Sequence, residues 1–299
     1  MSRHHAPTND LLFKRSLANA EHPDVTAGFI NDLLGLDVAS VHIENPYDIQ
    51  VFRDDLGTGS LKPTAVDVRV RLQDESQVVI EMQVQRQSVY LERALYYMAS
   101  RYIADYGQPD LGPVESKYRS LNAICGIHVL DFEQFDGDTC ALRNFALYDI
   151  LHRRFYGKSV VSDTVGGMFN LTFLELGKDR ETVSERVRYW MDFFKGRPLA
   201  DGVPDYIKTA LELSEEQNLT REEAQMISAQ ERAEQDLIGQ LSYARGEGRQ
   251  EGRQEGRQEN ALSNAQKALS AGLTEDLVQR ITGLDLNTIR QLKVAGSEN

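Results

Sequence analysis

Two carboxylates in neighbouring strand-like segments have the residue type and spacing to bind a divalent cation. Asp67 alternates with apolar residues in segment 66–72, and Glu81 does so in segment 78–84. If the segments pair as a hairpin, matching their apolar faces sets Asp67 either directly opposite Glu81 or on the diagonal from it. Facing carboxylates repel each other. Mg²⁺, which binds carboxylate oxygen and substrate phosphate, would offset that repulsion and could activate water to hydrolyse a phosphodiester.

The same polar face has interpretations in which no metal binds. Arg69 and Arg71 lie on the face that carries Asp67, so they could act as counter-ions on a solvated surface. A proton shared between the two carboxylates would also relieve their repulsion. The spacing alone leaves these alternatives open.

A helix expected near residues 88–105 could add cationic groups to the site. Arg93, Tyr97 and Arg101 recur every four residues and therefore lie along one helix face. A guanidinium can bind phosphate oxygens through two parallel hydrogen bonds, which suits a role in substrate binding. The alternative is an amphipathic surface helix whose tyrosines pack on the sheet.

One histidine lies close to these elements in the sequence, but its setting indicates a core residue. His128 falls within the strongly apolar run 121–132. There, a buried histidine with satisfied hydrogen bonds is favoured over a general base. The sequence has no nucleophile elbow, Walker-type phosphate loop or dinucleotide-binding fingerprint.

Strand-like and helix-like segments mix up to about residue 195, which predicts an α/β or α+β domain over residues 1–195. Asp10 precedes an apolar helical pattern and is a candidate N-cap. A second helix, residues 25–34, should end at Gly35. The other expected elements are strands at 66–72, 78–84, 121–132 and 168–176 and the helix at 88–105.

The chain changes character after this domain. Thr220 and Glu223 form a capping-box pattern that opens a long amphipathic helix within a helical extension, residues 196–245. Residues 246–260 repeat Gly-Arg-Gln-Glu. In a lone helix this repeat would place like charges four residues apart, and its glycines disfavour helix. The repeat is therefore either a flexible linker or a helix that pairs with another helix.

Residues 261–299 are expected to form a small helix-turn-helix-like module. Thr274 and Asn287 are candidate helix caps, and Gly272 and Gly283 are candidate helix ends. The residues expected to bury together are Leu273, Leu277, Ile281, Leu284, Ile289 and Leu292. Balanced charge without a basic recognition face favours packing or homo-oligomerisation over DNA reading. The heptad pattern is too weak to give the stoichiometry of a coiled coil.

Composition limits the classes of protein. The 299 residues carry a formal net charge of −13, which argues against a protein that coats nucleic acid, because such binding depends on Lys and Arg. Much of the acidic excess follows residue 200, so DNA is still possible as a substrate. No apolar run approaches the ~20 residues of a membrane span, and no secretory signal is expected. The two cysteines, Cys125 and Cys140, lack metal-ligand spacing and suit a cytoplasmic location.

Several short motifs together resemble a known family. They are NDLLFK at 9–14, Asp67, EMQ at 81–83, ERALYYMASRY at 92–102, AICGIHVLDF at 123–132 and FNLTFLELGK at 169–178. Their order and spacing are similar to those of the recombination-promoting nuclease (Rpn)/transposase family, which belongs to the PD-(D/E)XK nuclease superfamily. The resemblance covers roughly residues 7–195, and the glycine-rich tail is also common in that family.

The resemblance implies a restriction-endonuclease-like fold, in which helices flank a mixed sheet, followed here by an α-helical extension. It implies that Asp67 and Glu81 bind Mg²⁺ (or Mn²⁺ or Ca²⁺). Gln83 stands where the superfamily usually has Lys; its amide can orient water or phosphate but supplies no positive charge. Asp10 would be a further metal ligand, with the N-cap as its alternative role.

The same resemblance assigns the cationic helix to DNA. Arg93 would lie close to the scissile phosphate, and Tyr97 and Arg101 farther along the backbone. We therefore predict a metal-dependent DNA endonuclease linked to recombination or transposition. The alternative is a catalytically inactive nuclease-like scaffold that acts in oligomerisation or regulation, supported by Gln83 and the acidic tail.

Overall fold

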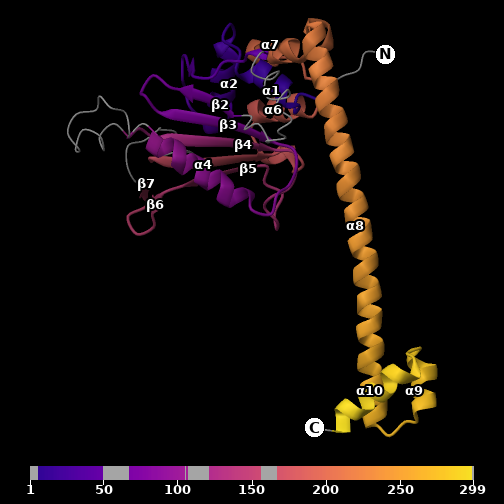
Figure 1. The fold of residues 1–299 in the computed structure, drawn as a ribbon. Coiled ribbons are helices and arrows are strands. Elements are labelled where there is room, and N and C mark those ends of the chain that lie inside the picture. Colours follow the sequence, from indigo (N-terminus) through magenta and orange to yellow (C-terminus); the bar gives the residue numbers. More distant parts are fainter. Residues whose placement is uncertain (1–5, 50–66, 105, 107–120, 156–166, 298–299) are drawn as a thin grey trace. The chain divides into compact units, whose positions relative to one another are not determined.

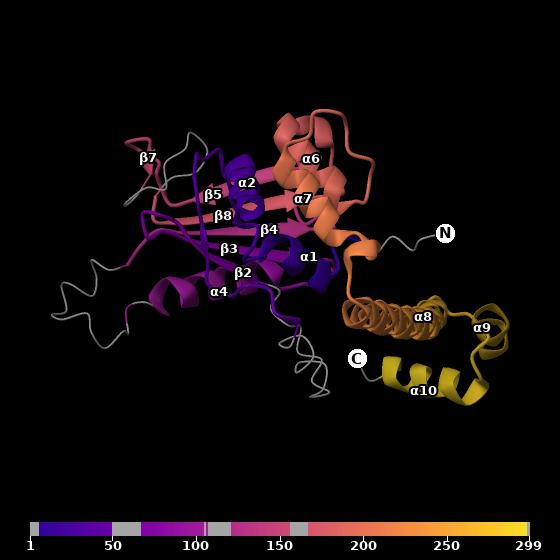
Figure 2. The same cartoon turned by 90° about the horizontal axis from the view of Figure 1, so that it is seen from above.

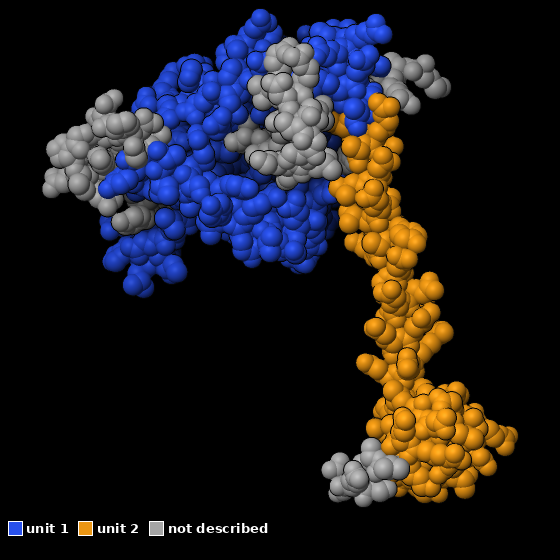
Figure 3. Space-filling model, in the orientation of Figure 1, with its two compact units in different colours: residues 1–229 blue, residues 230–299 orange. Residues whose placement is uncertain are grey.

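The computed structural model describes residues 6–49, 67–104, 106, 121–155 and 167–297. Its helices are α1 (Asp10–Leu17), α2 (Pro23–Leu34), α4 (Tyr90–Ala104), α6 (Glu185–Phe194), α7 (Asp205–Ser214), α8 (Arg221–Ser270), α9 (Glu275–Thr282) and α10 (Leu286–Ser297), with short 3₁₀ helices η2 (Arg180–Thr182) and η3 (Glu216–Asn218). Residues 1–229 and 230–299 form two compact units (Figure 3), and the division falls within α8.

The first unit is built on a mixed sheet whose described strands lie in the order β1-β2-β3-β4-β8-β5. These strands are β1 (His42–Ile43), β2 (Asp67–Arg71), β3 (Gln77–Gln83), β4 (Ile124–Leu130), β8 (Phe169–Glu175) and β5 (Leu142–Ala146). The central strands β3, β4 and β8 are parallel, and the remaining pairs are antiparallel. Two further strands, β6 (Tyr148–Asp149) and β7 (Arg154–Phe155), form a separate hairpin. The predicted mixed sheet flanked by helices is confirmed.

Alternation along the strands decides which face of the sheet becomes the main core. Val78, Ile80 and Met82 pair with Cys125, Ile127 and Val129 on that face, and all six are buried. They pack in one cluster with residues of α1, α2, α6 and α7, on one side of the sheet (Figure 1 and Figure 2). Helix α4 covers part of the opposite face, where it contacts β4. The polar residues of β3 therefore point toward the α4 side.

The local start and stop signals are mostly where the sequence predicts them. Helix α2 ends at Gly35, which has a left-handed backbone. Thr220 and Glu223 form the predicted capping box, with each side chain accepting from the other residue's backbone N–H. Asp10 is not the N-cap: the Asn9 side chain accepts from Leu11 N, and Asp10 is the first helical residue. Asn9 and Asp10 are both residue types that cap helices, and the helix begins after the earlier of the two.

The tetrad repeat, residues 246–260, lies inside α8 and is helical. In the C-terminal unit, Ala265 of α8 is buried together with Val278 of α9 and Ile289 of α10. Leu273, Leu284 and Leu292 pack against this cluster as predicted. The described helices include none that is long and apolar enough to cross a membrane.

Three expectations for the C-terminal module are corrected. Leu277 and Ile281 are 43% and 61% exposed, because the face of α9 that meets the other helices is the one that carries Val278. Asn287 is not a cap; Asp285 is, since its carboxylate accepts from the backbone N–H of Asn287 and Thr288.

The predicted helix ends at Gly272 and Gly283 both have left-handed backbones, as a helix C-terminus favours.

Candidate active site

The antiparallel register of β2 and β3 pairs Asp67 directly with Glu81. This is one of the registers that the apolar alternation allows, and it places positions 67 and 81 on the same face of the sheet. The backbone of Asp67 belongs to β2, whereas its side chain lies outside the described residues. The two positions whose carboxylates were predicted to share a cation are therefore cross-strand neighbours.

Glu81 is largely buried and is held by two basic groups. Its side chain is 13% exposed, with Oε1 3.8 Å from Nη2 of Arg93 and Oε2 3.1 Å from Nδ1 of His128. The first of these groups comes from α4 and the second from β4, so the helix and the adjacent parallel strand both fix the carboxylate. The proximity of Arg93 offsets the cost of burying a negative charge.

Arg93 connects the residues of this face. It donates from Nη2 to Gln83 Oε1 at 2.8 Å and from Nη1 to Gln87 Oε1, and its guanidinium lies over the ring of Tyr90 at 5.5 Å. Its Nε is buried and has no hydrogen-bond partner among the described residues. The predicted site residues Glu81, Gln83 and Arg93 are thus brought together, with the Arg93 side chain 23% exposed.

The other predicted residues lie in different surroundings. Arg101 donates to Glu44 at 3.1 Å, and Arg71 also pairs with Glu44 at 2.7 Å. Tyr97 is 49% exposed, and its ring lies 5.7 Å from that of Tyr96. Hence the described contacts of Arg101 join it to Glu44 rather than to Glu81.

Asp10 starts α1, a helix that contacts β2 on the side of the main core. Its side chain is partly buried. Within the described part of the chain, no group of three or more His, Cys, Asp or Glu residues could hold a metal ion. The metal-binding role of Asp10 therefore stays a prediction.

Two buried residues that the sequence did not assign to the site, His128 and Tyr90, lie behind Glu81. His128 is 2% exposed, and its Nδ1 lies 2.9 Å from the hydroxyl of Tyr90 as well as beside Glu81. Its ring stacks on Phe173, with centroids 4.9 Å apart. A Cβ at Gly126 would come within 2.9 Å of Nε2, so only glycine leaves room for the ring. His128 is buried as predicted, and the contacts of its Nδ1 belong to the candidate site, but its Nε2 is buried without a hydrogen-bond partner among the described residues.

The alternation of β4 contained the signal that would have placed His128. Once Cys125, Ile127 and Val129 are assigned to the main core, His128 must face the other way. The parallel register then sets His128 beside Glu81. What the sequence did not state was that these two strands are neighbours.

Tyr90 is a neutral hydrogen-bonding group beside His128. Burial raises the pKa of its hydroxyl well above the ordinary value, and the negative charge of Glu81 raises the pKa further. The hydroxyl therefore stays protonated across the physiological range. His128 Nδ1 must carry a proton to donate to the Glu81 carboxylate, and in that tautomer the Tyr90 oxygen accepts from the same N–H.

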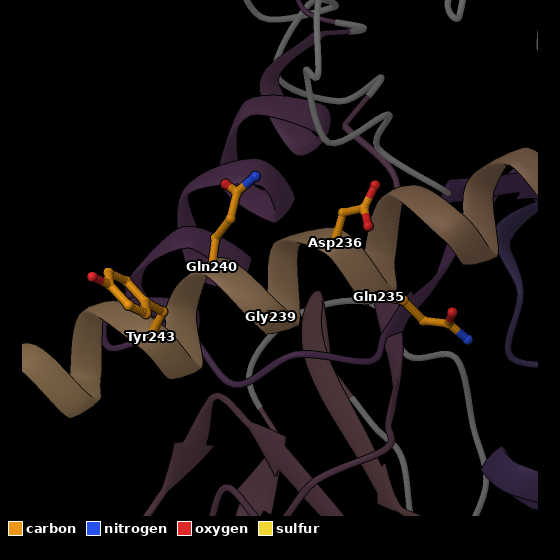
Figure 4. Close-up of a pocket in the computed structure, with 5 residues that line it drawn as sticks. All are labelled: Gln235, Asp236, Gly239, Gln240 and Tyr243. Carbon is orange, nitrogen blue, oxygen red and sulfur yellow. The ribbon is translucent and has the colours of Figure 1, made fainter.

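The pocket drawn in Figure 4 is a separate feature. It is a depression on one helix, α8, lined by Gln235, Asp236, Gly239, Gln240 and Tyr243. None of the residues grouped around Glu81 lines it.

Comparison with known proteins identifies a family. A family model described as PD-(D/E)XK nuclease family transposase matches residues 7–244, which is most of the chain. No curated protein and no solved structure matches the chain.

Proposed function

The chain belongs to the PD-(D/E)XK nuclease family of transposases, and from this premise we propose that it is a divalent-metal-dependent DNA endonuclease that acts in recombination or transposition. The proposal is supported above all by the pairing of Asp67 with Glu81 on one face of the sheet. Arg93, which reaches both Glu81 and Gln83, adds the positive charge that a phosphodiester substrate needs.

The donor set fits a hard divalent cation. Mg²⁺ usually takes one or two protein carboxylates and keeps water and substrate phosphate as its other ligands. Asp67 and Glu81 would supply those carboxylates, and Mn²⁺ would accept the same oxygens. Asp10 is proposed as a further ligand on the family resemblance alone, because α1 contacts β2 on the main-core side of the sheet and Glu81 faces α4. When bound, the cation would supply Lewis-acid stabilisation of the phosphoryl oxygens.

The side chains around that position have separate tasks in the proposed reaction. Arg93 stabilises the negative charge that develops on phosphorus-bound oxygens as water attacks. Gln83 orients water or phosphate through its amide, and because Arg93 donates to Gln83 Oε1, the guanidinium brings a positive charge to the position where the superfamily usually has Lys. His128 and Tyr90 hold the Glu81 carboxylate in place. Tyr97 and Arg101 are proposed to contact the DNA backbone farther along α4.

Supercoiled plasmid incubated with the purified protein tests this function. We expect nicked or linear products with Mg²⁺ or Mn²⁺, and none when a chelator is added before the metal. The inactive-scaffold alternative expects neither DNA binding nor cleavage at any metal concentration. Intact plasmid with both metals would favour that alternative.

A second copy of the chain is the proposed partner of α8. Residues 246–260 place Glu four residues from Glu and Arg four residues from Arg, an arrangement that destabilises a lone helix. Gly248, Gly252 and Gly256, each costing about 1 kcal/mol in a helix, have open space where a Cβ would project. A partner helix could approach along the glycines and place opposite charges beside the Glu residues and the Arg residues of the repeat. The full-length protein is therefore expected to be a homo-oligomer.

Replacing Gly248, Gly252 and Gly256 together with Gln should convert the oligomer to a monomer in light scattering. The same change raises helix propensity, so circular dichroism should show helicity that is kept or increased. The matched control replaces Gln250, Gln254 and Gln258 with Ala. These residues lie two positions after the glycines and about 200° around the helix, so their replacement should leave the mass of the oligomer unchanged. A monomeric native protein, or a glycine variant of unchanged mass, would contradict the pairing.

A further inference from the structure

The hairpin of β6 and β7 holds two large aliphatic side chains in solvent. Ile150 and Leu151 are 84% and 87% exposed, the highest values for large apolar residues in the described part of the chain. They occupy the turn between the two strands, beyond the end of the edge strand β5 (Figure 1). Exposed apolar residues are common singly, but an adjacent pair at a projecting tip needs a reason.

The turn is held in shape by its own hydrogen bonds. Asp149 Oδ1 accepts from the backbone N–H of Leu151 at 3.0 Å and of His152 at 3.1 Å. Its Oδ2 lies 2.7 Å from His152 Nδ1. These bonds fix the backbone on both sides of the apolar pair, so Ile150 and Leu151 are presented outward rather than folded back onto the sheet.

The tip is also basic, in a chain of net charge −13. His152, Arg153 and Arg154 follow the apolar pair directly, and all three are exposed. Asp149, the single acidic residue of the turn, is engaged by the backbone, by His152 and, at 3.9 Å, by Nε of Arg154. The tip therefore combines an apolar point with adjacent positive charge.

We propose that this tip is a DNA wedge: Ile150 and Leu151 insert at a base step of the duplex while Arg153 and Arg154 contact the flanking phosphates. The inference rests on the proposed function, because it assumes that DNA is the substrate. Side chains of this kind unstack a base step when only one or two of them enter. Leu147 and Tyr148, at the base of the hairpin, are also exposed, at 52% and 46%, but the adjacent arginines favour a polyanion over an apolar protein surface as the partner.

The position of the hairpin relative to Glu81 suits one duplex. Ala146, the last residue of β5, lies in the same cross-strand row as Val78, three strands away from it. With strands ~4.8 Å apart and ~3.3 Å per residue, the end of β5 is roughly 17 Å from Glu81. Ile150 follows Ala146 by four residues, which adds about 14 Å at most, so the tip lies within roughly 31 Å of Glu81. That distance is about nine base pairs at ~3.4 Å per pair along one strand. The wedge and Glu81 can therefore engage the same helical turn of DNA.

The test uses full-length protein and a duplex of about 30 base pairs, three helical turns. The duplex carries the fluorescent base analogue aminopurine at its TA and CA steps, which unstack most easily. Binding is followed in chelator, so that no cleavage occurs. We expect the native protein to raise aminopurine fluorescence and the variant with Ile150→Ser and Leu151→Ser to bind about tenfold more weakly or worse without that rise. Leu277→Ser with Ile281→Ser, an exposed aliphatic pair on α9, is the matched control and should behave as native.

The arginines give an independent readout. Because each phosphate contact contributes about 0.9 to the dependence of log K on log salt, Arg153→Ala with Arg154→Ala should reduce that slope by about two. A native fluorescence rise in the Ile150/Leu151 variant, or an unchanged slope in the arginine variant, would overturn the wedge. If both variants bind DNA like the native protein, and the native protein cuts plasmid, the wedge is rejected and the proposed function stands. If the native protein neither binds nor cuts DNA, the proposed function is lost as well. Variants that lose binding to anionic vesicles but not to the duplex would assign the tip to a membrane and overturn the DNA wedge.

Discussion

Glu81→Gln is expected to reduce metal-dependent DNA cleavage by about 10³-fold or more, because it removes one of the two carboxylates proposed to bind the cation. The substitution keeps the size of the side chain, and its one remaining oxygen can still accept a hydrogen bond from His128. The fold should therefore survive the change. Initial rates of plasmid nicking over a range of Mn²⁺ concentrations measure the loss, and excess metal should not restore the rate.

Glu92→Gln is the matched control for this variant. Glu92 is an exposed residue of α4, next to Arg93 in the sequence but on the solvent side, so the same chemical change there should leave the nicking rate within about twofold of native. Thermal melting of both variants checks that the sheet is intact. Equal rates for Glu81→Gln and native protein would remove Glu81 from the mechanism.

Arg93→Ala is expected to lower kcat by about 10²- to 10³-fold, the range seen when one donor to a developing charge is removed. Arg93 is the residue through which α4 reaches both Glu81 and Gln83. Because the proposed interaction strengthens as charge develops, kcat should fall more than KM rises. Arg93→Lys should recover only part of the loss, since an ammonium cannot reach Gln83, Gln87 and substrate in the same forked geometry.

Arg186→Ala provides the control for loss of an arginine from a helix. Arg186 lies on α6, is exposed, and contacts the hydroxyl of Tyr206 at 3.2 Å, away from the polar face of β3. Its removal should leave kcat and KM near their native values. A kcat for Arg93→Ala equal to that of native protein, with the protein folded, would show that the guanidinium plays no part in the chemical step.

The cross-strand pairing could be predicted because strand alternation is local information. Residues 66–84 encode two apolar faces and a short turn, and matching those faces restricts the register until Asp67 and Glu81 must be neighbours. The placement of Arg93 followed from the helix period and from the family resemblance. The order of strand-like and helix-like segments indicated a domain of mixed helices and strands, and the family resemblance supplied the mixed sheet flanked by helices.

Other parts of the site depend on which elements become neighbours, which no local pattern states. His128 reaches Glu81 only because β4 is the parallel neighbour of β3. Arg101 turns to Glu44 because β1 adds to the edge of the sheet beside β2, where Arg71 meets the same carboxylate. In the tail, the sequence could not decide whether the repeat at 246–260 is a linker or a helix. Its like charges and glycines disfavour a lone helix, yet the segment is helical.

The pairing of Asp67 and Glu81 around one cation can be observed in crystals soaked in Mn²⁺. Anomalous scattering should place a single ion about 2.0–2.2 Å from a carboxylate oxygen of each residue, the distance that a small hard divalent ion requires. An ion bound elsewhere on the chain, or no ion between these two side chains at a concentration that supports cleavage, would contradict the mechanism.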